Sequence, residues 1–377
     1  MPVRATYRRT SSLPVGNYGG GPRRGQERRI LQRGPRGTAV LLALATSASV
    51  ASFLAIRSFW PFLVAACCYA VAQSGLGAAR QALLAGLVAP GERTGVLAHV
   101  QSTVNAGLAV GAGLGGIALY SGTRCGFLTV FAVDAVSFLA GALVLRRLPA
   151  VTPVSLARGP ALAVLRDRPF TLITLLNAVL LLRMPLLSLG IPLWISEHTQ
   201  APEWLVSALF LLNTLAVAAF QVRAARGVTS MGTAVSAVRR SGWILLLSCV
   251  VFAVSAAGVP VWVVASVLLA GAVLHVVGEM LHSAGSWQIA FGLAPDGRVG
   301  EYQGFFGTGL TVARTAGPLL LTALLVTWGV PGWLLLGGLF VAASYAMGPA
   351  VRWAERSRPA APASAPSGTP DAETVQA

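Results

Sequence analysis

Charge is scarce in this sequence, and one cation is missing altogether. Only 11% of the 377 residues are charged, lysine does not occur, and 12 acidic residues stand against 28 arginines. So few polar residues cannot cover the surface of a water-soluble globule when 55% of the residues are hydrophobic. The composition therefore predicts a membrane protein with lipid as part of its solvent.

Cysteine and cofactor motifs are also scarce. Cys67, Cys68, Cys125 and Cys249 show no metal-ligand spacing, and three of them lie in apolar runs where a thiol acts as a small hydrophobe. We find no nucleotide-binding loop and no cluster of His, Asp and Ser on one membrane face. We therefore expect no metal, no cofactor, no direct use of ATP and no enzymatic activity.

What the chain does contain is a series of ten apolar stretches. Each is long enough to cross a bilayer as a helix of about 20 residues, so the predicted fold is an all-α, polytopic helix bundle with about ten transmembrane helices. The predicted spans are residues 38–56, 60–88, 96–120, 127–145, 170–196, 204–223, 241–257, 261–291, 302–328 and 333–351.

The arginines gather before and between these spans. Residues 1–37 and the central loop 149–168 are rich in arginine, which predicts a cytoplasmic location for both and, by alternation of the later links, for both termini. A net charge of +16 suggests nucleic acid when taken alone, but this placement is typical of a membrane protein. We expect no nucleic-acid partner. Residues 1–37 and 354–377 are predicted to be disordered, because they lack apolar runs.

A short repeat relates the two predicted halves, 38–148 and 169–353. Ala, Pro and Arg of segment 89–93 recur in segment 294–298 at a constant offset of 205 residues, and both copies fall on a predicted cytoplasmic link. A short match can arise by chance, but a parallel repeat of an even number of helices requires this placement. The first copy follows span 60–88, and one span precedes that helix. The second copy follows span 261–291, and three spans lie between the central loop and that helix. By this count the first half lacks two helices.

Residues 33–356 resemble the major facilitator superfamily. The resemblance rests on the helix ending at residues 77–84, the loop 89–93, the glycine-rich helix after it, and Asp134-Ala135-Val136-Ser137-Phe138. It implies two halves of six helices, here four plus six, and the chain resembles actinobacterial drug-efflux-like members of the family. The family's signature loop, with an Asp-Arg pair and a Gly-Arg-Arg run, is represented only by residues 33–37, without the acidic residue.

Three ionisable residues share one face of the eighth span. His275, Glu279 and His282 follow the spacing i, i+4, i+7, and ionisable groups at membrane depth usually line a pathway or pair with each other. One hypothesis makes Glu279 the proton acceptor and His275 its partner or second proton site. The alternative is a structural Glu-His pair that fixes helix packing, which we favour for His282. The pair Gly278-Glu279 also resembles one in the tenth helix of several facilitator-type exporters and peptide transporters, which favours the functional hypothesis for Glu279.

Arg183 lies midway along the fifth span, just before Pro185. An unpaired guanidinium there costs several kcal/mol, about 3 or more, so a partner is expected. Asp134 and an anionic group of the substrate are the candidates, with backbone carbonyls as the alternative, and Pro185 predicts a kink. Asp134 is a candidate for proton coupling, or it holds an arginine of a loop near the headgroups.

Other polar side chains within the spans are candidates for substrate binding. They are Asn177, Asn213, Arg80 and Arg314. For Arg314 we favour interhelical packing, because Gly317-Pro318 follows closely.

The glycine-rich helix allows two interpretations. Its glycines include Gly107, Gly111, Gly115 and Gly116. A dinucleotide fingerprint needs a strand, a turn and a helix, whereas here one apolar span surrounds the run, so close helix packing is favoured. The run also resembles the antiporter motif of facilitator-type exporters, with Ala112 in place of its proline, which favours export over import.

The predicted function is proton-coupled secondary transport. We expect a monomer in the plasma membrane that exports a small amphipathic molecule by alternating access, with protons, the substrate and lipid as partners. The alternative is a non-transporting remnant of such a transporter.

Overall fold

A computed structural model describes residues 34–149, 163–202, 204–258, 260–295 and 298–358. Every regular element in these ranges is helical, so the all-α prediction is confirmed. Eight helices are continuous: α2 (Pro35–Ser52), α3 (Phe59–Leu87), α4 (Arg93–Ser121), α5 (Arg124–Arg147), α9 (Trp204–Ala225), α10 (Met231–Val254), α11 (Val261–Gly292) and α13 (Val330–Arg356).

Two further spans are interrupted by widened turns with π-helical hydrogen bonding. One consists of α6 (Arg168–Leu180), α7 (Arg183–Pro185), η3 (Leu186–Gly190) and α8 (Ile191–His198), and the other of α12 (Val299–Leu321) and η4 (Thr322–Thr327). In the described part of the chain, eight spans are long and apolar enough to cross a membrane. Together, the eight continuous helices and the two interrupted spans make ten in the described residues, which agrees with the prediction of about ten helices.

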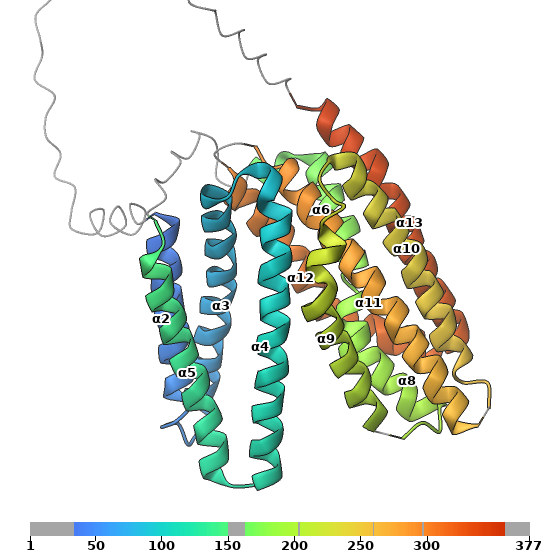
Figure 1. Cartoon of the computed structure of the whole chain (residues 1–377), viewed down its shortest axis with the longest axis horizontal. Helices are drawn as coiled ribbons and strands as arrows, with labels where there is room; N and C mark the ends of the chain where they lie inside the picture. The colour runs from blue at the N-terminus through green and yellow to red at the C-terminus, as the bar shows by residue number, and fades with distance from the viewer. Residues whose placement is uncertain (1–33, 150–162, 203, 259, 296–297, 359–377) are drawn as a thin grey trace, which may run out of the picture.

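The helices form two groups, which we call the N group (α2 to α5) and the C group (α6 to α13) (Figure 1). The C group has a core with bulky, fully buried side chains such as Trp194, Trp333, Phe252 and Phe340. The core of the N group consists of Ala39, Ala43, Leu76, Ala79 and Ala142.

The first third of α4 joins the two groups. The hydroxyl of Thr94 donates a hydrogen bond to Oε1 of Gln288 on α11 at 2.6 Å, and the hydroxyl of Ser102 donates to the carbonyl of Ala218 on α9. The guanidinium of Arg93 lies over the ring of Phe291, 5.6 Å from its centroid. The far end of α4 is exposed, since Tyr120 has 96% of its surface free.

The repeat-related segments occupy equivalent places. Segment 89–93 links α3 to α4, and Arg298 of the second copy precedes α12, which follows α11. Across the two groups, α3 contacts α12 and α4 contacts α11. This crossed pairing is what a pseudo-two-fold arrangement of two repeats produces.

The helix boundaries lie close to the predicted ones except at α10. That helix begins at Met231, ten residues before the predicted start, where Ser230 and Thr233 form a capping box. Arg239 and Arg240, which were placed in a link, therefore lie within α10. The disorder predicted for 1–37 and 354–377 falls largely outside the described residues, although residues 35–37 belong to α2 and 354–356 to α13.

Candidate functional site

The site begins with the break in the α6 to α8 span. Pro185 has no N–H group to donate to the carbonyl of Leu181, and its ring excludes a regular turn. Helix α6 ends at Leu180, the backbone N–H of Met184 donates to the carbonyl of Leu181 at 3.0 Å, and η3 follows Pro185. The span is thus interrupted at the residue where a kink was expected.

Glycines of α12 allow that helix to lie against the break. A Cβ added at Gly317 would stand 2.6 Å from Cγ of Pro185, and one added at Gly309 would stand 3.4 Å from the carbonyl oxygen of Thr174. Pro318 follows within α12, close to the widened turn η4. Gly317, which follows Arg314 closely in the sequence, therefore lies where α12 packs against Pro185.

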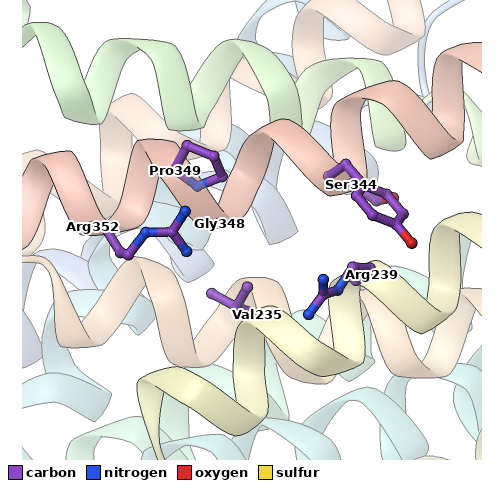
Figure 2. Close-up of a pocket in the computed structure, with 7 residues that line it drawn as sticks. Val235, Arg239, Ser344, Gly348, Pro349 and Arg352 are labelled. Atoms are coloured by element: carbon purple, nitrogen blue, oxygen red, sulfur yellow. The ribbon is translucent and has the colours of Figure 1, made fainter.

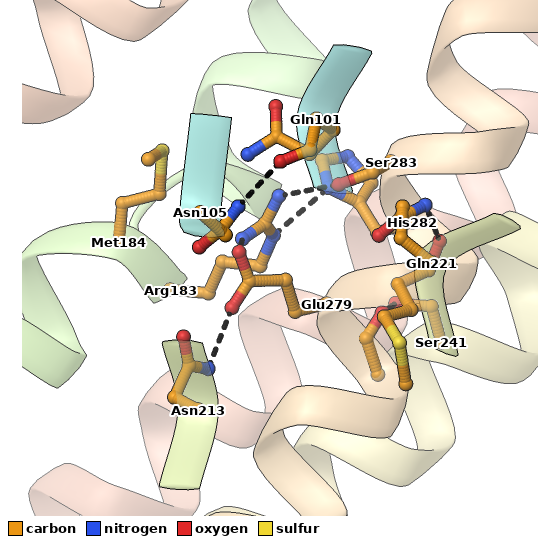
Figure 3. Close-up of polar contacts among 12 residues, drawn as sticks. Gln101, Asn105, Arg183, Met184, Asn213, Gln221, Ser241, Glu279, His282 and Ser283 are labelled. Carbon is orange, nitrogen blue, oxygen red and sulfur yellow. Dashed lines mark hydrogen bonds and ion pairs between the residues drawn. The ribbon is translucent and has the colours of Figure 1, made fainter. Parts of the chain in front are cut away.

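Arg183 forms an ion pair with Glu279 across the C group. Its Nη1 lies 2.9 Å from Oε1 of Glu279 on α11, and only 3% of Arg183 is exposed. The other carboxylate oxygen of Glu279 accepts a hydrogen bond from Nδ2 of Asn213 on α9 at 2.9 Å. Figure 3 shows these side chains directed toward one another. The pair ties the broken span to α9 and α11.

His282 and Ser283 hold the rest of the guanidinium. Nε of Arg183 donates to Nδ1 of His282 at 3.1 Å, and Nη2 donates to Oγ of Ser283 at 3.0 Å (Figure 3). Because Nδ1 accepts, the ring hydrogen of His282 lies on Nε2, which then donates to Oδ1 of Asn177 on α6 at 3.1 Å. We call the set of Asn177, Arg183, Asn213, Glu279, His282 and Ser283 the polar network.

His275 lies one helical turn from Glu279 and is 1% exposed. Its ring is near Glu279 and the backbone of Arg183, but neither ring nitrogen has a partner at hydrogen-bonding geometry in the described part of the chain. A buried polar group without a partner is costly. His275 is therefore a buried imidazole beside the polar network whose hydrogen-bonding capacity is unsatisfied within the described residues.

Three other candidates lie outside the polar network. Asp134 is half-buried on α5, while Arg80 on α3 and Arg314 on α12 are exposed. In the ranges that the structure describes, none of the three side chains forms an ion pair or a hydrogen bond. Arg183 is thus paired with Glu279 and not with Asp134, because α5 belongs to the other helix group.

The glycine run of α4 does not pack as expected. A Cβ added at Gly107, Gly111, Gly115 or Gly116 would meet no atom of the described residues within 4 Å. Small residues permit a close approach but do not by themselves supply a neighbour. The run lies within one continuous helix, so the dinucleotide interpretation has no strand or turn to support it.

Sequence reasoning missed part of the polar network. It gave His282 a role in helix packing but did not foresee that its partners are Arg183 and Asn177, and it overlooked Ser283 altogether. The proximity of both residues to Glu279 on a single helix was the available signal. Among the described residues, no three His, Cys, Asp or Glu side chains gather in a way that could hold a metal ion.

This architecture is similar to that of known membrane transporters. The sequence model of the Major Facilitator Superfamily matches residues 29–278. The crystal structure of the human organic anion transporter MFSD10 (TETRAN) is similar with a TM-score of 0.65 at 19% identity, over 83% of this chain and 77% of that one. A bacterial homologue of the iron transporter ferroportin, in an outward-facing state, gives 0.61 at 18% identity, over 88% and 85%. No curated protein sequence matches the chain.

Proposed function

Because this chain belongs to the major facilitator superfamily of membrane transporters, we propose that it exports a small amphipathic molecule in exchange for protons. The buried ion pair between Arg183 and Glu279 carries the proposal. Ionisable groups within a membrane bundle are costly and typically mark the path of a substrate or a proton.

Proton binding at Glu279 would change how the helices are held together. A neutral Glu279 no longer attracts the guanidinium, whereas Arg183 keeps its hydrogen bonds to His282 and Ser283. As a result, the ion pair that ties the broken span to Glu279 is lost, and the link through Glu279 to Asn213 on α9 weakens. Such a change in a contact between helices is what shifts a transporter between two states of access.

Exchange follows if a substrate and a proton compete for one carboxylate. A cationic group of an amphipathic substrate would bind Glu279 when the proton leaves, and a returning proton would displace it. His275, buried one turn away, is the proposed second proton site. Asn213 orients the carboxylate, and Asn177 orients Arg183 through His282.

A second candidate substrate is an amphipathic anion. Arg183 is a buried cation that becomes available when Glu279 is protonated, so an anion and a proton would then bind together and move in the same direction. The solved human structure named an organic anion transporter shares this fold. The two candidates differ in the expected sign of coupling to the proton gradient.

Several finer features belong to the same proposal. We place the chain among drug-efflux-like members, of actinobacterial type, acting as a monomer in the plasma membrane with both termini cytoplasmic. Arg80 and Arg314, exposed on α3 and α12, are proposed substrate contacts, and residues 38–148 and 169–353 the two moving halves. The described residues hold four spans in the N group and six in the C group, so the non-transporting alternative is tested as well.

The test measures dye efflux from cells that express the chain. Fluorescent amphipathic cations and anions are compared with and without a proton uncoupler, for the wild type, E279Q and the control E197Q. Glu197 is exposed at the end of α8. We expect uncoupler-sensitive efflux that E279Q abolishes and E197Q retains.

The dye that moves distinguishes the two substrates. Cation efflux supports exchange, and anion movement together with protons supports the second candidate. Wild-type cells that match empty cells for both dyes, with the protein confirmed in the membrane, would contradict transport of either and favour the remnant.

A further inference from the structure

A small cavity opens between α10 and α13, on the side of the C group away from the polar network. Its volume is about 200 Å³, and Figure 2 shows it between the two antiparallel helices. Its lining residues are Val235, Arg239, Ser344, Tyr345, Gly348, Pro349 and Arg352. Sites for drug-sized ligands begin at roughly 300 Å³, so this pocket suits a smaller group.

Two arginines from different helices flank the opening. Figure 2 shows the side chains of Arg352 on α13 and Arg239 on α10 on either side of Val235. Both residues are exposed, and neither side chain forms an ion pair with a carboxylate in the ranges that the structure describes. Glu355 lines an adjoining cavity with Arg352 but makes no ion pair with it. The opening is therefore positively charged.

The pocket is kept open by the backbone beneath it. A Cβ added at Gly348 would stand 3.2 Å from Cγ1 of Val235 and 3.6 Å from Nη1 of Arg352. A side chain at that position would occupy the space between Val235 and Arg352. The ring of Tyr345 supports the guanidinium of Arg239, whose carbon lies 5.3 Å from the ring centroid.

Three exposed aromatic side chains lie on these two helices, and one of them, Tyr345, lines the pocket. Trp243, Tyr345 and Trp353 are 52%, 46% and 43% exposed, and Nε1 of Trp243 donates to the hydroxyl of Tyr345 at 3.0 Å. Exposed Trp is typical of the headgroup layer of a bilayer, and Trp353 lies three residues from the end of α13. Arg352 lies about 6 Å from the end of α13 and Arg239 about 12 Å from the start of α10, at 1.5 Å per residue. Long arginine side chains at such depths reach the headgroups.

We propose that the Arg239–Arg352 pocket binds the phosphate group of an anionic phospholipid. Two guanidinium groups without carboxylate partners match a phosphate anion, and Trp353, beside Arg352 near the end of α13, matches the boundary between headgroup and acyl chain. Free inorganic phosphate shares the anion but lacks the acyl chains. The proposal is independent of the transported substrate.

The test is lipid retention by the purified full chain. Nanodiscs with equal phosphatidylglycerol and phosphatidylcholine are dissolved, and native mass spectrometry gives the ratio of the two lipids on the protein. We expect R239Q and R352Q each to lower this ratio about fivefold and the double variant about 25-fold. R240Q is the control, since Arg240 is exposed on α10 outside the pocket.

Inorganic phosphate distinguishes the two sources of the anion. If it displaces phosphatidylglycerol at millimolar concentration, or raises the melting temperature of the wild type as much as the lipid does, the lipid assignment is wrong. An unchanged lipid ratio in the double variant, or an equal fall in R240Q, overturns the site. If the double variant fails to melt cooperatively in pure phosphatidylcholine, it is not folded, and the lipid ratios of the two single variants decide instead.

Discussion

The N group and the C group fill their interiors in different ways. The C group buries tryptophans and phenylalanines in one continuous core, whereas the core of the N group contains four alanines and one leucine. Burial of large aromatic side chains contributes most to packing energy. The comparison indicates that the C group is the better packed part of the described chain.

Charge is distributed in the same way. The buried ion pair of Arg183 and Glu279 belongs to the C group, together with all its hydrogen-bond partners. In the described N group, the side chains of Arg80 and Asp134 have no such partners. The C group thus carries both the packed core and the candidate site, and α4 supplies most of the contact from the other side.

Breaking the ion pair from one side should have the largest effect on stability. Arg183→Leu leaves the charge of Glu279 buried without its partner and should lower the free energy of unfolding by about 3–5 kcal/mol. Arg183→Leu/Glu279→Leu should recover most of this loss. Thermal denaturation in detergent measures both, with Arg80→Leu as the matched change in the N group, expected within about 0.5 kcal/mol. Equal melting temperatures for Arg183→Leu and Arg80→Leu would contradict the contrast.

Removal of a core aromatic side chain tests the packing difference. Trp333 is fully buried against Trp194 and Phe252, at ring centroid distances of 5.6 and 5.4 Å. Trp333→Ala should cost about 3–5 kcal/mol, and Leu139→Ala, at a position 43% exposed in the N group, less than about 0.5 kcal/mol. Denaturant unfolding of the two variants gives the comparison. A large loss for Leu139→Ala would indicate packing in the N group that the described contacts lack.

Glycine replacement should act with opposite sign in the two groups. Gly317→Ala forces a contact with Pro185 and should destabilise by about 1–3 kcal/mol. Gly111→Ala meets open space on α4 and should stabilise by about 0.5–1 kcal/mol, because alanine favours helix. Melting temperatures measure both changes. If Gly111→Ala destabilised the protein, the result would support the close helix packing that the sequence suggested for this run.

The smallest effect is expected at Asp134. Its carboxylate is half-buried without an ion-pair partner among the described residues, so Asp134→Asn should change proton-driven efflux by less than about twofold, within 0.5 kcal/mol. Glu279→Gln should abolish the same activity. The initial efflux rate after imposing a pH gradient measures both. A complete loss in Asp134→Asn would place a second coupling site in the N group.

The positions of the helices could be predicted from the sequence more reliably than the contacts between them. Apolar length located the spans, and Pro185 located the break, because both effects act within one segment. The requirement that Arg183 have a partner also followed from membrane depth alone. Its identity did not, since helical periodicity tells which residues share a face but not which helix lies opposite.

The start of α10 shows a second limit. Arg239 and Arg240 ended the apolar stretch, so the span was predicted to begin after them. Long arginine stems can lie along an apolar helix while their charged ends reach polar surroundings. The capping residues Ser230 and Thr233, ten residues earlier, mark the true helix start.

The two widened turns have a mechanical consequence. Gly190 of η3 lies against η4, where an added Cβ would stand 2.9 Å from Cδ1 of Leu325, so the two irregular turns are at the same level in adjacent spans. Widened turns are rare within helices and are common at functional positions. Bending stiffness should therefore be lowest at this one level, so that α8 and the segment after η4 can tilt together while Asn177 and Arg183, which precede η3, stay in place.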